Sequence, residues 1–148
     1  MSGRWWTLGL ENWANQIAAR YGHPVYLVGS AIEQGANARD VDIVVILPTD
    51  EFMGRFGGKW MAMYDLTTPW NDEEKRLATE IGKMSATAAR LTGLNIDMKV
   101  QSVKEIYMYR MNKKKEAAGD PNPHDRFLDR PRVRLDTLDL PELELPVE

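Results

Sequence analysis

The chain has 148 residues and a mass of 16.9 kDa, the size of one ordinary domain with a hydrophobic core of its own. Its composition, 43% hydrophobic and 28% charged residues with no cysteine, is typical of a soluble globular protein and excludes disulfides and thiolate metal sites. The net charge of -3 excludes a global attraction to nucleic acid, and no run of residues has the apolar length of a signal peptide or a membrane span. We therefore expect a cytoplasmic protein that makes no membrane contact.

The first predicted elements are a helix and two strands. Apolar residues recur at three- and four-residue spacing from Leu10 to Tyr21, and Gly22 follows as a stop signal, which predicts an amphipathic helix. The run VYLVG at 25–29 predicts a short buried strand. The run VDIVVIL at 41–47 is apolar on both alternating faces beyond its aspartate, which predicts a strand covered on both sides.

The following residues predict a loop, a helix, a strand and a further helix. Residues 49–71 combine glycines and a proline with aromatic residues and methionines, which predicts a loop with one helical turn. Residues 71–93 carry an apolar stripe, acids in the first turn and a terminal glycine, so they predict a long helix. Residues 94–102 alternate between apolar and polar, as a half-buried strand does, and residues 102–115 predict a last helix.

Residues 119–148 form a predicted tail, separate from a domain over residues 1–118. The tail holds five of the eight prolines, and from Asp136 onward it has five acids and no base, which predicts an extended or mobile segment. Its alternating acidic and apolar residues can add as a strand to a protein partner or to a second copy of the chain. The order helix, strand, strand, helix, strand predicts an α/β (α+β) fold, a small mixed β-sheet flanked by helices.

Two aspartates at the start of the second strand are candidate metal ligands. Asp40 and Asp42 alternate with a buried residue and point to the same side, with Cα atoms roughly 6.6 Å apart. Two bare carboxylates beside a low-dielectric strand repel one another, and a divalent ion held between them removes the repulsion. Oxygen ligands without cysteine or a nearby histidine favour Mg²⁺ or Mn²⁺ over zinc.

Gly29 and Ser30 stand where a strand ends and a short helix is expected to begin. Glycine lets a ligand approach the backbone, and a helix start offers N–H groups to phosphate. Ser30 with Glu33 three residues later is equally a capping box, so a purely structural role stays open. A phosphate site beside a magnesium site predicts a place for a metal-bound nucleoside triphosphate.

These motifs together resemble the nucleotidyltransferase superfamily that includes DNA polymerase beta. The resemblance rests on three motifs in order: Val28-Gly29-Ser30, then after nine residues Asp40-Val41-Asp42-Ile43, and on a later strand Ile96-Asp97-Met98. It covers roughly residues 10–105 and is closest to the minimal stand-alone members, which lack a separate nucleobase or acceptor domain. It implies a nucleotidyltransferase-like fold.

The resemblance also implies an activity and the residues that perform it. Asp40 and Asp42 bind the metals, Asp97 completes the metal site and activates an acceptor hydroxyl, and Ser30 with the Gly29 backbone holds the triphosphate. The implied reaction is a Mg²⁺-dependent transfer of a nucleoside monophosphate, with release of pyrophosphate. ATP is the favoured donor, and the acceptor can be a small molecule, a protein side chain or an RNA end.

Several residues allow a second interpretation. The two aspartates can be a solvated strand start, and Asp97 can be an acid on the polar face of its strand. Lys99 supports a phosphate or neutralises Asp97, and Arg39 binds nucleotide or forms a surface salt bridge.

Residues 54–60, GRFGGKW, suit a flap over the triphosphate, with Arg55 or Lys59 reaching the pyrophosphate, or a plain loop.

A second function is a binding or regulatory protein on the same scaffold, with weak or lost catalysis, such as the antitoxin partner of a toxin. Its partner, or a second copy of the chain, is expected to dock through the tail. A third interpretation is a structural protein whose acids bind nothing.

Overall fold

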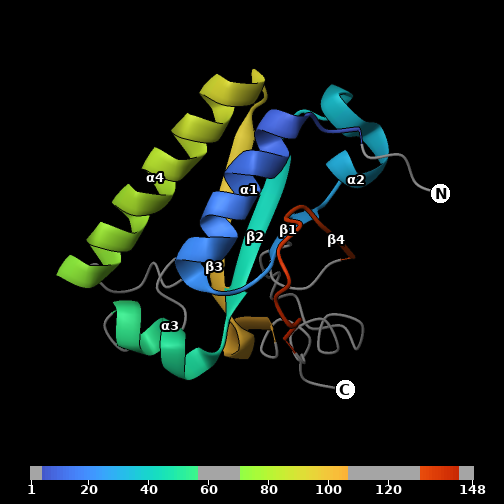
Figure 1. Ribbon diagram of the computed structural model, residues 1–148. Coiled ribbons are helices and arrows are strands. Elements are labelled where there is room, and N and C mark those ends of the chain that lie inside the picture. The colour runs from blue at the N-terminus through green and yellow to red at the C-terminus, as the bar shows by residue number, and fades with distance from the viewer. Residues whose placement is uncertain (1–4, 57–70, 107–130, 144–148) are drawn as a thin grey trace, which may run out of the picture.

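The computed structural model describes residues 5–56, 71–106 and 131–143 (Figure 1). Its elements, in chain order, are α1 (Leu8–Tyr21), β1 (Val25–Val28), α2 (Ala31–Gln34), a 3-10 turn η1 (Gly35–Asn37), β2 (Val41–Leu47), α3 (Thr49–Phe56), α4 (Asp72–Thr92), β3 (Ile96–Ser102) and β4 (Arg132–Arg134).

The strands form one mixed sheet in the order β3-β2-β1-β4 within the described part of the chain. β1 runs antiparallel to β2 and to β4, and β2 runs parallel to β3. The predicted fold class, a small mixed sheet flanked by helices, is confirmed.

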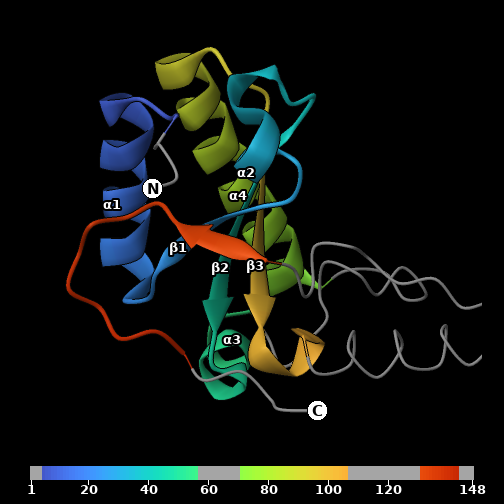
Figure 2. The ribbon, with the colours of Figure 1, turned by 90° about the vertical axis from the view of Figure 1, so that its right-hand side faces the viewer.

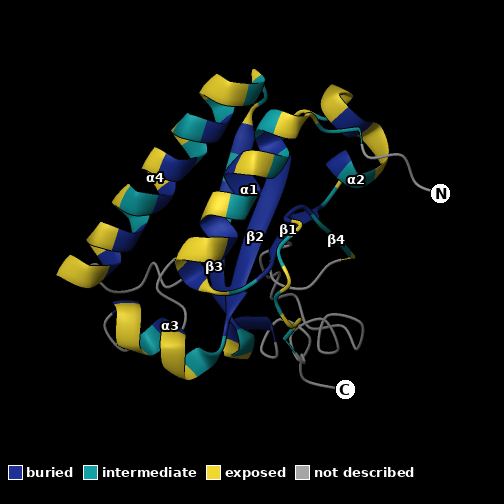
Figure 3. Cartoon of the chain, viewed as in Figure 1, coloured by how far each residue is buried: buried dark blue, intermediate teal, exposed yellow. Residues whose placement is uncertain are grey.

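α1 and α4 cover one face of the sheet, which we call the helix face (Figures 1 and 2). Buried side chains of both helices pack there against every second residue of the strands, among them Trp13, Ile17, Leu27, Ile43, Val45, Leu77, Met84 and Met98. β2 is buried over its whole length, as its apolar sequence predicts (Figure 3). Among residues 5–56, 71–106 and 131–143, no helix combines enough length with enough apolar character to cross a membrane.

The alternate strand residues point to the opposite side, which we call the second face. Tyr26, Val28, Val44 and Ile46 form a smaller buried cluster there with Ile106. Because the side chains of a strand alternate, Asp42 shares this face with Val44, and Asp97 shares it with Lys99. The functional candidates therefore lie on the side of the sheet opposite to α1 and α4.

The prediction of a loop over residues 49–71 is wrong at its start. The chain forms the helix α3 there, and residues 57–70 lie outside the described part. Phe52 and Phe56 are four residues apart, are buried, and contact edge to face with ring centroids 5.1 Å apart. Burying two phenylalanines stabilises this helix by more than the about 1 kcal/mol that Gly54 costs in its interior.

The predicted tail contributes a strand to the sheet. β4 pairs with β1 at the edge of the sheet (Figure 2), and the Leu135 N–H continues the ladder by donating to the Val25 carbonyl at 2.8 Å. Leu138 and Leu140 then pack on the helix-face core, whereas Leu143 packs on the second-face cluster. Residues 131–143 therefore wrap around the β1 edge of their own domain, across the boundary that the sequence predicts after residue 118.

Asp136 fixes this wrap from a buried position. Its side chain is 0% exposed, accepts a hydrogen bond from the Val25 N–H at 2.9 Å, and forms an ion pair with Arg134 at 3.0 Å. Arg134 also donates to the Leu138 and Leu140 carbonyls, at 2.7 and 3.1 Å. A buried carboxylate is tolerated here because several donors compensate for its lost hydration.

We predict that Asp136→Ala lowers the free energy of unfolding by about 3 kcal/mol, because it leaves the Val25 N–H and the Arg134 guanidinium without their acceptor. Urea unfolding followed by circular dichroism measures the change. Asp139→Ala removes an exposed acid three residues away and serves as the matched control, with an expected effect within about 0.5 kcal/mol. Equal losses for the two variants would contradict the role of Asp136.

Candidate functional site

The residues predicted to bind metal and nucleotide gather where β1 ends and where β2 and β3 begin. Val28, the last residue of β1, pairs with Asp42 on β2, and Asp42 pairs with Asp97 on β3. Partners in register share a face of the sheet, so the two carboxylates lie side by side on the second face, with Cα atoms roughly 4.8 Å apart. Gly29 and Ser30 follow Val28 directly and lie at the same end of the sheet.

The two paired carboxylates differ in exposure. Asp42 is 9% exposed between its neighbours on β1 and β3, whereas the Asp97 side chain is 41% exposed. Lys99 Nζ lies 3.6 Å from Asp97 Oδ1, so Lys99 compensates the charge of Asp97, as the second interpretation of this lysine predicts. The result is a buried acid beside an accessible acid that is balanced by a cation.

Asp40 takes a different place from the other two acids. It precedes β2, and its carboxylate accepts a hydrogen bond from the Asn95 side-chain amide, which also lies 3.4 Å from the Arg39 carbonyl. Asn95 is the residue before β3, so this contact ties the starts of the two parallel strands together. The Arg39 side chain is exposed, and among the described residues it forms no ion pair with Asp40.

The three acids do not converge on one point. Within the described ranges, no group of three or more histidine, cysteine, aspartate or glutamate side chains is placed to hold a metal ion. The pair Asp42 and Asp97 fits Mg²⁺ in its donor chemistry, because this ion is commonly bound by one or two carboxylates together with substrate phosphates. A cation shared by Asp40 and Asp42 stays a prediction.

Gly29 and Ser30 have a backbone suited to a close ligand. Gly29 has φ 78°, a conformation that side chains with a Cβ rarely adopt, so glycine is favoured at this turn. Ser30 is exposed and its side chain makes no capping hydrogen bond, so the capping-box interpretation with Glu33 is wrong. α2 has four residues, too few for a strong helix dipole, so any phosphate contact depends on the Gly29-Ser30 backbone and the Ser30 hydroxyl.

The predicted flap contact by Arg55 is wrong. Arg55 lies on α3, which follows the far end of β2, roughly 17 Å along the strand from Asp42. Its guanidinium lies 5.3 Å from the centre of the Tyr21 ring, and its carbonyl accepts from Arg76 at 2.6 Å. Lys59 and the remainder of the predicted flap lie outside the described residues.

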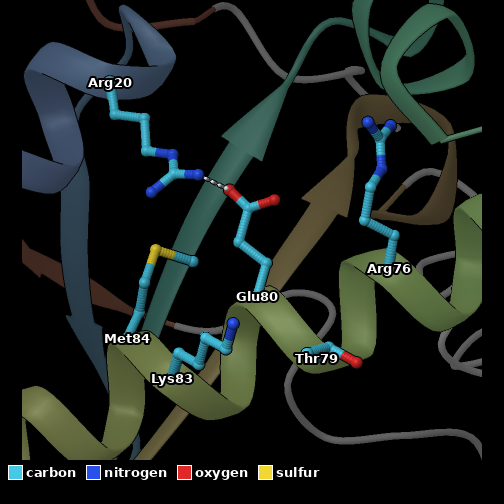
Figure 4. Close-up of a pocket in the computed structure, with 6 residues that line it drawn as sticks. All are labelled: Arg20, Arg76, Thr79, Glu80, Lys83 and Met84. Carbon is cyan, nitrogen blue, oxygen red and sulfur yellow. Dashed lines mark ion pairs between the residues drawn. The ribbon is translucent and has the colours of Figure 1, made fainter.

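Two shallow hollows of about 330 and 370 Å³ lie in the groove between α1 and α4. Figure 4 shows residues that line the first of them. The two hollows share Arg20, Lys83 and Met84, and Arg20 forms an ion pair with Glu80 at 2.8 Å across the first of them. These hollows are on the helix face, whereas the predicted site is on the second face. We place the site by the carboxylates and the Gly-Ser turn because the hollows contain no acids arranged for a metal.

Sequence reasoning missed Asn95 and two residues of the second face, Tyr26 and Arg132. Arg132 lies on the edge strand β4, where it pairs with Val28 of β1. Its guanidinium lies 5.1 Å from the centre of the Tyr26 ring. The alternation Arg-Val-Arg directly after Pro131 is a weak strand signal that the high proline content of the tail obscures.

Comparison of the chain with protein-family models, with curated proteins and with solved structures found no match. We therefore infer the function of the protein from the geometry of the site.

We predict that Mn²⁺ binds beside Asp42 and Asp97. In two-dimensional NMR spectra, substoichiometric Mn²⁺ should broaden the amide signals of Asp42, Asp97 and Gly29 and leave those lining the α1–α4 groove sharp. The double variant Asp42→Asn/Asp97→Asn removes both negative charges and should lose the effect.

Asp50→Asn, which removes an exposed acid on α3, is the control for this experiment and should retain the broadening. Broadening that spreads over surface acids and survives in the double variant would contradict a metal site at this position.

Proposed function

We propose that the protein is a magnesium-dependent nucleotidyltransferase that transfers a nucleoside monophosphate, most readily AMP from ATP, to an acceptor hydroxyl. One observation carries the proposal, namely the register of the three strands. Asp42 on β2 pairs with Asp97 on β3 and, on its other side, with Val28 on β1. The Gly29-Ser30 turn follows Val28 directly. Two carboxylates beside a glycine turn supply a metal site and a phosphate site at one end of one sheet. A cytoplasmic setting, where ATP and Mg²⁺ are abundant, is part of the proposal.

Asp42 and Asp97 would hold the metal, and Asp40 stands two residues before Asp42 in the sequence. When bound, Mg²⁺ neutralises phosphate charge and stabilises the charge that develops on the transferring group. Asp97 is the accessible acid of the pair and is therefore the group that accepts the proton of the acceptor hydroxyl. Lys99 is 3.6 Å from Asp97 and holds this carboxylate in place.

The reaction then needs position and charge balance from the protein. A bond forms between the acceptor oxygen and the α-phosphorus, the bond from that phosphorus to the bridging oxygen breaks, and pyrophosphate leaves with the electron pair. The acceptor proton passes to Asp97 and then to solvent. The Gly29 backbone and the Ser30 hydroxyl orient the triphosphate for this displacement. A small molecule, a protein hydroxyl and an RNA end are the acceptor classes to be compared.

A second candidate is a binding protein on the same scaffold with weak or no catalysis, such as an antitoxin component. The observation that favours it is the Asp40–Asn95 hydrogen bond, which engages one of the three predicted acids within the domain. A partner that docks by strand addition to residues 135–143 is not favoured, because Leu138, Leu140 and Leu143 of this segment already pack against the same chain.

We predict that Mg²⁺ with ATP stabilises the native chain and not the double variant Asp42→Asn/Asp97→Asn. Ligand at about a hundred times its dissociation constant adds about 2.7 kcal/mol, a shift of a few degrees in a domain of this size. Thermal unfolding against each of the four nucleoside triphosphates, with and without Mg²⁺, measures the effect and identifies the donor. Stabilisation that persists in the double variant would place the nucleotide elsewhere.

We also predict that Asp97→Asn lowers the transfer rate about 10²- to 10⁴-fold while ATP binding falls less, because it removes the proton acceptor and leaves Asp42 and the Gly-Ser turn. Transfer of label from ATP labelled at the α-phosphate to each acceptor class, with release of pyrophosphate, is the assay. Asp50→Asn serves as the matched control and should retain the native rate. Binding of ATP without transfer to any acceptor would favour the second candidate.

A further inference from the structure

One row of residues crosses the second face of the sheet from strand to strand. The register places Asp97, Asp42, Val28 and Arg132 in line, on β3, β2, β1 and β4 in that order. At about 4.8 Å between strands, Arg132 lies roughly 10 Å from Asp42, measured between Cα atoms. The row therefore has two acids at one end, a cation at the other, and the Gly29-Ser30 turn beside its middle.

The arginines of β4 differ in what they contact. Arg134 donates to Asp136 and to the Leu138 and Leu140 carbonyls, so its guanidinium is committed to holding the wrap around the sheet edge. Arg132 is half-buried and lies over the Tyr26 ring. Arg132 also hydrogen-bonds to the Tyr26 hydroxyl, so the ring and the hydroxyl together hold the guanidinium in place without cancelling its charge. A guanidinium has five N–H donors, so donors remain to bind an anion.

The Tyr26 ring is a neutral support for this arginine. Burial, and to a smaller extent the nearby Glu142, raise the pKa of the Tyr26 hydroxyl, and the charge and hydrogen bond of Arg132 offset only part of this rise, so the phenol stays protonated at neutral pH. Glu142 is the acid that faces Tyr26 from the wrapping segment, and it is exposed. Among the described residues on the β1–β4 side of the carboxylates, Arg132 is therefore a cation that Tyr26 holds in position and whose remaining donors can reach a ligand.

We infer that Arg132 binds the β- and γ-phosphates of the nucleoside triphosphate, the two that leave as pyrophosphate. This inference rests on the proposed function, because it assumes that the α-phosphate lies at Asp42 and Asp97. Val28 is buried, so the distal phosphates then extend along the partly exposed Gly29-Ser30 turn toward the positive end of the row. Guanidinium groups bind phosphate through paired charge-assisted hydrogen bonds, which suits the negative charge that grows on a leaving pyrophosphate.

The test measures binding of ATP, AMP, inorganic pyrophosphate and tripolyphosphate by calorimetry in Mg²⁺, for the native chain and three variants. Arg132→Ala should weaken ATP, pyrophosphate and tripolyphosphate about 10- to 100-fold and leave AMP unchanged, since AMP has no distal phosphate. Arg132→Lys should restore part of the loss, because it keeps the charge and loses the paired geometry. Arg20→Ala removes an arginine from the helix face and should leave all four affinities unchanged.

The outcomes separate this inference from the function on which it rests. If Arg132→Ala binds ATP as tightly as the native chain, or loses the same affinity for AMP and ATP, the role of Arg132 is overturned and the proposed nucleotide site is retained. Binding of pyrophosphate and tripolyphosphate that depends on Arg132, with no binding of ATP, supports the phosphate site and overturns the proposed function. No binding of any of the four ligands overturns both. Thermal unfolding of each variant checks that the three-residue strand β4 still forms.

Discussion

The pairing of Asp42 with Asp97 across the parallel strands β2 and β3 is the constraint on which the rest of the site depends. Like charges in direct register cost free energy in a sheet, and Asp42 is also largely buried. Such a pair is retained in a stable domain when nearby groups offset its cost. Lys99 does so for Asp97, Asp42 also has a partner within the domain, and a bound cation would offset the repulsion between the two acids further. The pair therefore places two acids in direct register at one end of the sheet, which is the arrangement on which the proposed metal site depends.

The same register depends on contacts far from the two acids. The Asn95 amide bonds to Asp40, and the Asn95 carbonyl accepts from the Val41 N–H at 2.8 Å, so the starts of β2 and β3 are joined before the ladder begins. At the other edge, the buried Asp136 holds the chain against Val25 and lets β4 close the exposed side of β1. An edge strand without this cover would present unpaired backbone groups. The segment after residue 130 is therefore structural as well as a source of second-face cations.

Local patterns in the sequence predict much of this arrangement. Apolar spacing locates α1, α4 and the three longer strands, and the Gly-Ser and Asp-x-Asp motifs place the site at one end of the sheet, where the structure also has Gly29, Asp42 and Asp97. The sequence does not predict α3, because Gly54 between Phe52 and Phe56 is typical of a loop. It does not predict β4, because three residues are too few to show an alternating pattern. The contacts of Asn95 and of Arg132 join residues far apart in sequence, so they are set by packing and leave no local signal.

The engagement of Asp40 by Asn95 changes what kind of metal site the geometry can support. Three converging carboxylates would form a cage that holds ions on its own, whereas two neighbouring carboxylates bind Mg²⁺ firmly only when further oxygen ligands arrive. In a nucleotidyltransferase these ligands come from the triphosphate, so metal and nucleotide would bind together and each would increase the affinity for the other. A cation at the far end of the row adds to this coupling, because Arg132 would hold the distal phosphates while the acids hold the metal. With the acids at one end of the row and Arg132 at the other, the proposed site would be complete only when a triphosphate links the two ends. A small domain with a single sheet could bind nucleotide in this way.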